Sequence, residues 1–223
     1  MATARGPGTQ LRADAARNRQ EIIKAARELY GRRGLDAPLD EIARLARVGN
    51  ATLYRHFPSR CALAAAVFAD TLCRVIEAAS LALNDPDPWH AFAAHVRFLA
   101  QLQATDRGLA DLLITEVTGA PELEQLRSRA LEGFTRIAGR ARTSGALRAD
   151  FTPEDLVLLL MANAGLVDRT ADAAPEAWQR FIDLALDGLR TLAGTTPTAT
   201  RPPPDRGALR QAMINRGHFL GYG

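Results

Sequence analysis

The sequence has few or none of the features that mark several classes of protein. Its only cysteines, Cys61 and Cys73, lie 12 positions apart. On one helix this spacing separates them by about 18 Å, which is too far for a mutual disulfide and favours a reducing compartment. No apolar run approaches the roughly 18 residues of a membrane span, and the N-terminal segment lacks the apolar centre of a secretory signal. We therefore expect a cytoplasmic protein with no membrane partner.

Signatures of enzymes and metal sites are also absent from the sequence. It contains no G-x-S-x-G, no G-x-G-x-x-G, no Walker loop and no H-E-x-x-H motif. Its four histidines have no cysteine or carboxylate partners at metal-ligand spacing. We therefore predict that the protein is not an enzyme and that it holds no cofactor and no metal.

Charge is distributed unevenly along the 223 residues. The first 60 residues contain 12 Arg or Lys and 6 Asp or Glu, which gives a net charge of +6. The remaining 163 residues contain 16 Arg or Lys and 19 Asp or Glu, which gives a net charge of −3. A cationic part of this kind is the electrostatic signature of a surface that meets phosphates. We therefore expect double-stranded DNA to be a partner of the N-terminal part.

The stretch 39–57 has the pattern of two short helices joined by a tight turn at 47–50. Apolar residues of the first helix fall on one face, and Leu53 and Phe57 do so in the second. This is the layout of a helix-turn-helix, whose second helix enters the DNA major groove. The side chains on the other faces are candidates for contacts with phosphates or base edges. They are Thr52, Tyr54, Arg55 and His56, with Arg44 from the first helix.

The segment 22–63 resembles the DNA-binding domain of the tetracycline-repressor (TetR) family of bacterial transcriptional regulators. The matching runs are IIKAARELYGRRG, LDEIARLA and VGNATLYRHFPSR, followed by Ala62-Leu63. Arg47 departs from the pattern, because it stands in the turn where the family commonly has glycine. A positive φ there would cost an arginine about 1 kcal/mol. The resemblance implies that Arg60 binds a phosphate and that four residues of the second helix meet the groove: Asn50, Ala51, Thr52 and Tyr54.

Helical spacing continues along the chain and no strand pattern appears, so we predict an all-α protein of about nine helices. The resemblance implies that a long helix after residue 58 joins a DNA-binding head to a ligand-binding and dimerisation domain. We expect four segments: a disordered basic arm at 1–13, the helix-turn-helix domain at 14–60, the ligand-binding and dimerisation domain at 61–193, and a Pro-rich linker and tail at 194–223. The arm could follow the DNA backbone or could be a solvated tail.

The last two helices, expected at 153–168 and 175–192, carry more apolar surface than one chain readily covers. The resemblance implies that this pair forms a four-helix bundle in a homodimer. The alternative is a monomer that buries both helices internally. The predicted interface consists of Leu156, Leu159, Leu160, Leu166, Val167, Trp178, Phe181, Ile182, Ala185 and Leu189.

Apolar and aromatic side chains also gather on the helices expected at 88–104, 108–117 and 121–142. Such a stripe is usually ordinary core, and His95 within it is more often a hydrogen-bonded core residue than a ligand contact. Asn163 could line a pocket or fix the register of a dimer. We predict a small, largely apolar ligand held by one or two hydrogen bonds. The predicted lining is Trp89, Phe92, His95, Val96, Leu99, Leu113, Glu116, Val117, Phe134, Ile137, Met161 and Asn163.

The sequence thus predicts a transcriptional repressor that is released from a palindromic operator by a small-molecule effector. The alternative is a dimeric DNA-binding regulator with no such effector, whose body serves only for dimerisation or for binding a protein partner.

Overall fold

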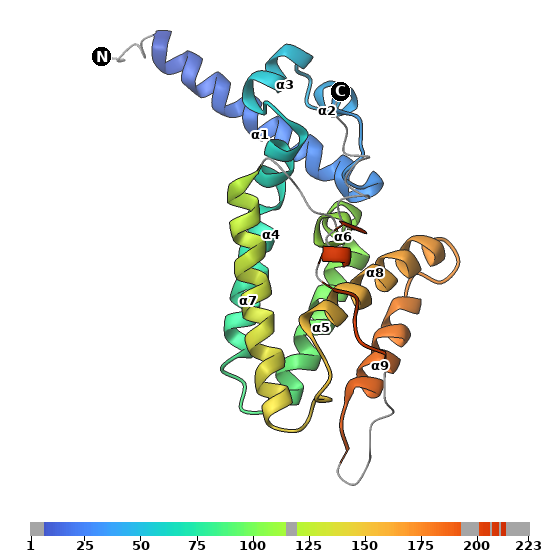
Figure 1. Cartoon of the computed structure of the whole chain (residues 1–223). Coiled ribbons are helices and arrows are strands. Elements are labelled where there is room, and N and C mark those ends of the chain that lie inside the picture. The colour runs from blue at the N-terminus through green and yellow to red at the C-terminus, as the bar shows by residue number, and fades with distance from the viewer. Residues whose placement is uncertain (1–6, 115–119, 193–200, 206, 210, 213–223) are drawn as a thin grey trace.

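The computed structural model describes residues 7–114, 120–192, 201–205, 207–209 and 211–212. Within these ranges the chain is helical and contains no strand, which confirms the predicted all-α class; Leu147 and Arg190 form one isolated backbone bridge. The named helices of the described part are shown in Figure 1. They are α1 (Pro7–Arg33), α2 (Leu39–Leu45), α3 (Asn50–His56), α4 (Arg60–Ala82), α5 (Pro88–Thr105), α6 (Arg107–Ile114), α7 (Pro121–Thr143), α8 (Pro153–Thr170) and α9 (Ala177–Leu189).

Two helix boundaries differ from the sequence prediction for clear physical reasons. Helix α1 begins at Pro7, so residues 7–13, which we expected to be disordered, are helical. Proline suits a first helical position, and the alanine, arginine, glutamine and leucine that follow favour a helix. Helix α9 ends at Leu189, before the expected residue 192, because the next residues pair with the loop between α7 and α8. The amide of Thr191 donates to the Ala146 carbonyl over 2.9 Å.

Helices α1, α2 and α3 form the head of the molecule (Figure 1). They enclose one end of a hydrophobic core in which Ile22, Tyr30, Ile42 and Leu53 are at most 1% exposed. These residues recur at one-face spacing in their helices, which is why the pattern predicted them as core. Burial of such large side chains contributes about 1.5–3 kcal/mol each, so it fixes the angle at which α3 crosses the head.

Helix α4 contributes to two hydrophobic cores. Its first half places Val67 and Phe68 in the core shared with the head. Its second half places Val75 and Ala79 in the core of the body, which we define as α4–α9. At 1.5 Å per residue the helix is about 35 Å long, and it runs alongside α7 (Figure 1). A tilt of α4 in the body would therefore move the head.

Candidate functional site

The turn between α2 and α3 has a backbone geometry that normally belongs to glycine. Arg47 has φ of +57°, and it is the only non-glycine residue with a positive φ in the part of the chain described. The Val48 amide donates to the Ala43 carbonyl over 3.0 Å, and the Arg47 amide donates to the Arg44 carbonyl over 3.1 Å. These two bonds form a Schellman motif, which ends a helix with one left-handed residue. Arg47 therefore adopts the positive φ whose cost was considered from its place in the turn.

Helix α3 is held against the head by its inner face and by its first residue. Leu53 and Phe57 are buried in the head core. The Asn50 amide Nδ2 donates to Asp40 Oδ1 over 2.9 Å, which ties the start of α3 to the start of α2. The outer face consists of the exposed side chains of Ala51, Tyr54 and Arg55. Because the inner face fixes the rotation of the helix, these outer side chains point together away from the head.

Two of the predicted contact residues on α3 are less accessible than the sequence suggested. Thr52 and His56 are half-buried. The Nε2 atom of His56 is covered and has no hydrogen-bond partner, and its ring lies 6.5 Å from that of Phe57. The Arg19 guanidinium lies over the Phe57 ring, 5.3 Å from the ring centroid, which is a cation–π distance. Nε2 of His56 could reach a phosphate only if its surroundings moved.

Arg60 has an intramolecular role that the resemblance did not imply. Its Nη1 donates to the Leu35 carbonyl over 2.7 Å and also to the Ala37 carbonyl. The guanidinium therefore binds the loop between α1 and α2, and it is half-buried. It also lies near the buried Tyr30 hydroxyl, whose pKa is raised to about 12 chiefly by burial, while the Arg60 charge lowers it. To contact a phosphate, Arg60 would have to use donor groups that remain beside its hydrogen bonds to this loop.

The arginines in the second half of α1 differ from those of the α2–α3 unit in their partners. Arg27, Arg32 and Arg33, in the second half of α1, form ion pairs with Asp70, Glu28 and Glu41 at 3.9, 3.1 and 2.6 Å. Three others lie in or beside the α2–α3 unit and are exposed: Arg44, Arg47 and Arg55. Among the described residues, no acidic side chain pairs with any of these three. Uncompensated positive charge is thus concentrated around α3.

Helices α8 and α9 leave some apolar side chains uncovered, but these are not the ones predicted for the dimer interface. Leu158 on α8 and Leu184 on α9 are 38% and 53% exposed. The predicted interface missed both, because the two helices are apolar around much of their circumference and the pattern did not give their rotation. Three predicted interface residues instead belong to the core of the same chain: Leu156, Leu160 and Ile182. The others are half-buried: Leu159, Leu166, Val167, Trp178, Phe181, Ala185 and Leu189.

Most of the residues predicted to line a ligand pocket pack against one another in the core of the body, whereas Leu113 packs against the core shared with the head. The Phe92 ring lies 5.9 Å from Phe134 and 5.3 Å from Phe151, and the His95 ring lies 6.3 Å from Phe134. Seven of the predicted residues are buried: Phe92, His95, Val96, Leu99, Phe134, Ile137 and Asn163. Trp89, Leu113 and Met161 are half-buried, and Glu116 and Val117 lie outside the described residues.

Polar groups within this core are only partly satisfied. Asn163 Nδ2 donates to Gln103 Oε1 over 2.9 Å, and Gln103 Nε2 donates to the Leu160 carbonyl over 3.3 Å. Asn163 Oδ1 and His95 Nε2 are buried without a hydrogen-bond partner. Burial lowers the pKa of His95 to about 4, so the imidazole is neutral at pH 7. Unsatisfied buried polar atoms are uncommon and costly, so each of these two atoms is a candidate to form a hydrogen bond with a ligand.

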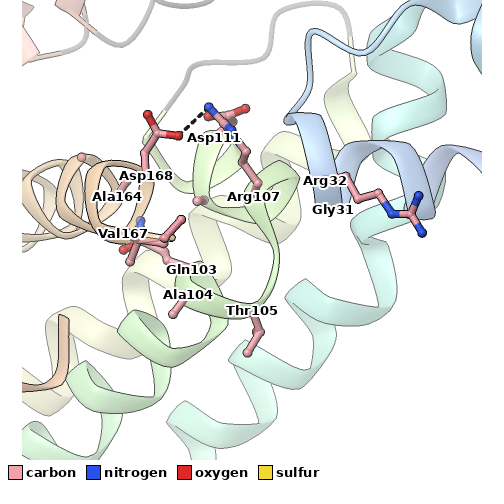
Figure 2. Close-up of a pocket in the computed structure, with 13 residues that line it drawn as sticks. Gly31, Arg32, Gln103, Ala104, Thr105, Arg107, Asp111, Ala164, Val167 and Asp168 are labelled. Atoms are coloured by element: carbon pink, nitrogen blue, oxygen red, sulfur yellow. Dashed lines mark ion pairs between the residues drawn. The ribbon is translucent and has the colours of Figure 1, made fainter. Parts of the chain in front are cut away.

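A separate cavity of about 280 Å³ lies where the head meets the body (Figure 2). No sequence pattern predicts this cavity, because its walls come from four helices that are distant in the chain. Small side chains leave the space open, and an ion pair between Arg107 and Asp168 crosses it with a separation of 2.6 Å. The lining consists of Gly31, Arg32, Gln103, Ala104, Thr105, Arg107, Ala110, Asp111, Ala164, Gly165, Val167, Asp168 and Ala171.

The described residues form neither a metal site nor a membrane-spanning helix. No group of three or more His, Cys, Asp or Glu side chains is arranged there to hold a metal ion. No helix of the described ranges has both the length and the hydropathy needed to cross a membrane.

Two family models match the chain, one in the head and one in the body. Residues 22–67 match the model of bacterial regulatory proteins of the tetR family. Residues 87–191 match the model of the C-terminal domain of SbtR-like transcriptional regulators. No curated protein matches the chain.

Solved structures with the same arrangement include several regulators. A TetR transcriptional regulator from Streptomyces coelicolor is 32% identical, and the match covers 81% of this chain and 99% of that chain with a TM-score of 0.50. RolR in complex with resorcinol is 24% identical, with coverage of 86% and 98% and a TM-score of 0.52. FadR from Bacillus subtilis in complex with stearoyl-CoA is 18% identical, with coverage of 79% and 99% and a TM-score of 0.54. The last two likenesses concern the fold alone.

Proposed function

Because this chain belongs to the TetR family of bacterial transcriptional regulators, whose members are DNA-binding proteins rather than enzymes, we propose that it is a homodimeric repressor of a palindromic operator. The observation that carries the proposal is the outer face of α3. It presents Tyr54 and Arg55 beside the uncompensated charges of Arg44 and Arg47. A helix with this exposure enters the major groove, and the surrounding arginines bind the phosphates on either side.

Direct reading of the operator is assigned to the first half of α3. Asn50, Ala51, Thr52 and Tyr54 face the groove, and Arg44 and Arg55 contact bases or the backbone. Tyr54 is the strongest candidate, since its side chain is 47% exposed although it is large and aromatic. His56 and Arg60 act mainly by holding the surface together, because their described contacts are within the head.

A homodimer is supported by the apolar surface that α8 and α9 leave uncovered. Leu158 and Leu184 are exposed, and Trp178 and Phe181 are half-buried. Aromatic and leucine side chains of this kind are typical of the centre of an interface. A dimer also explains specificity, since one α3 reads only a few base pairs. Two copies separated by about 34–36 Å, or a multiple of it, read a palindrome.

Release by a small molecule is supported by the partly satisfied polar groups in the body. An apolar ligand that parted the aromatic residues around Phe92 could donate hydrogen bonds to His95 Nε2 and Asn163 Oδ1. Its binding would alter the packing of α5 against α4 and therefore the angle of the head. Such a ligand shifts the protein only to the extent that it binds one conformation better than the other. The alternative is a dimeric regulator without an effector, which the tight packing around Phe92 favours.

The DNA-binding proposal is tested by selecting an operator from random duplexes and measuring affinity by fluorescence anisotropy. Tyr54→Ala should weaken binding about 30-fold, since each of two copies would lose a contact worth about 1 kcal/mol. Arg136→Ala is the control, because Arg136 is an exposed arginine of α7 in the body. Equal affinities of the two variants for the selected duplex would overturn the assignment of α3.

A further inference from the structure

The cavity at the junction of head and body lies apart from the aromatic core to which the effector is assigned. Gly31 and Arg32 of α1 form one wall, and Ala164 and Val167 of α8 form the opposite one. Its floor is Gln103, whose amide is 1% exposed and is already bonded to Asn163 and to the Leu160 carbonyl. The volume of about 280 Å³ is just below the range of roughly 300–1,000 Å³ typical of ligand pockets. A ligand would have to be small.

The position of the cavity depends on a close approach of α6 to the head. A β-carbon at Gly108 would lie 2.7 Å from the Tyr30 β-carbon and 2.8 Å from Phe68 Cζ, so only glycine allows this contact. The neighbouring Asp111 accepts a hydrogen bond from the Leu35 amide over 3.0 Å. Helix α6 is therefore fixed to the end of α1, and Arg107 at its start faces α8.

The charged residues of the lining are two arginines and two aspartates, namely Arg32, Arg107, Asp111 and Asp168, and the Asp111 carboxylate already accepts a hydrogen bond from the Leu35 amide. Arg107 Nη2 lies 2.6 Å from Asp168 Oδ1, and both side chains are about half exposed, at 52% and 51%. Figure 2 shows this pair joining α6 to α8, whereas the Arg32 guanidinium points away from the other residues of the lining. Arg32 also pairs with Glu28 at 3.1 Å. An exposed ion pair contributes only about 0–1 kcal/mol, so a ligand can open it at little cost.

We propose that this cavity binds a compact zwitterion, namely a small free amino acid. Its carboxylate would bind the Arg107 guanidinium and its ammonium group would bind the Asp168 carboxylate, so neither side chain loses a partner. A ligand with a single charge would leave one of the two unpaired, which is why both charges are needed. The side chain would lie against Ala104, Ala164 and Val167, where only a short aliphatic group fits.

Occupancy of this site would connect the head to α8, a helix of the proposed dimer interface, without involving the aromatic core. Because the walls come from α1 and α8, the affinity for the amino acid depends on how these helices are placed relative to each other. By thermodynamic reciprocity, the bound amino acid would favour that same placement. The site is thus a second input beside an apolar effector, and the hydrogen bond between Gln103 and Asn163 connects the two sites.

The test uses the full chain in the absence of DNA and measures thermal unfolding and heats of binding. L-Alanine, L-valine and L-leucine are the probes. At a concentration ten times its dissociation constant, the best of them should raise Tm by about 3–5 °C. Isobutylamine and isovalerate, which are L-valine without its carboxylate or its ammonium group, should bind at least about 10-fold more weakly.

Variants then locate the site. Asp168→Asn should weaken binding of the best amino acid at least about 10-fold. Asp183→Asn is its control, since Asp183 pairs with Arg97 at 3.0 Å with both side chains 52% exposed, and it should leave binding unchanged. Ala104→Leu should fill the cavity and abolish binding, whereas Ala94→Leu, on the exposed face of the same helix, should not.

The proposal is overturned if none of the three amino acids binds, if isobutylamine or isovalerate binds as tightly as L-valine, or if Asp168→Asn and Asp183→Asn behave alike. Because the readout contains no DNA, any of these results leaves the proposed repressor function standing. Conversely, loss of operator recognition in the DNA experiments would leave the amino-acid site standing.

Discussion

Arg47 offers a quantitative test of the geometry of the helix-turn-helix. Its φ of +57° places an L-residue in the left-handed region, at a cost of about 1–2 kcal/mol. The same motif ends α7, where the residue is Gly145 with φ of +77°. Substitution Arg47→Gly removes the strain but increases the entropy of the unfolded chain, which costs about 0.4–1 kcal/mol. We expect a net stabilisation of about 0.5–1 kcal/mol, or roughly 1–4 °C in Tm.

The assay is thermal and urea unfolding of three variants side by side. Arg47→Ala retains the β-carbon and should therefore gain little or nothing. Arg44→Gly introduces glycine three residues earlier, inside α2, and should destabilise by about 1 kcal/mol. If Arg47→Gly lowered the stability as much as Arg44→Gly does, the left-handed backbone conformation of residue 47 would be contradicted. Arg47→Gly and Arg47→Ala lose the same charge, so an equal loss of DNA affinity in both would reflect the charge and not the turn.

Three further predictions concern the body of the protein. The pKa of His95 falls from 6.5 to about 4 on folding, so its stabilising contribution is complete above pH 6.5 and is lost as the pH falls towards 4. When the pH is lowered from 7.5 to 5.5, the free energy of unfolding of the wild type should fall by about 1.4 kcal/mol more than that of the His95→Gln variant. Leu184→Glu places a charge in the proposed dimer interface, and it should weaken self-association at least about 30-fold in analytical ultracentrifugation. Leu81→Glu is the control, since Leu81 lies on α4 and is 67% exposed, and it should leave the dimer intact. Arg140 donates to the Leu83 and Asp85 carbonyls over 2.6 and 2.8 Å. Arg140→Met should therefore lower the free energy of unfolding in urea by about 2 kcal/mol. If the exposed Arg136→Met lowered it equally, this role of Arg140 would be contradicted.

The helix-turn-helix could be predicted in detail because it is specified by local sequence. Leu53 and Phe57 are four apart and share a buried face. Arg47 stands in the turn where glycine is common, so the pattern marked the position as unusual, whereas its φ of +57° came from the structure. Interactions between neighbours in sequence are enough to define such a unit, and this explains the agreement.

The remaining features depend on contacts between distant segments, which a pattern does not contain. Leu156 and Leu160 were assigned to an interface but lie in the core of the chain, because periodicity on a helix that is apolar all round does not give its rotation. Arg60 turned inward because the loop after α1 presents carbonyls to it. The junction cavity needed α1, α5, α6 and α8 to be placed together, and its charged residues, Arg107 and Asp168, are 61 positions apart.

The central claim is that two copies of α3 read a two-fold symmetric site, and hydroxyl-radical footprinting of the selected operator tests it most directly. The account predicts two protected patches related by the symmetry of the operator, with centres about 10–10.5 base pairs apart or a multiple of that distance. Tyr54→Ala should weaken both patches equally. A single protected patch on an operator without two-fold symmetry would contradict the claim.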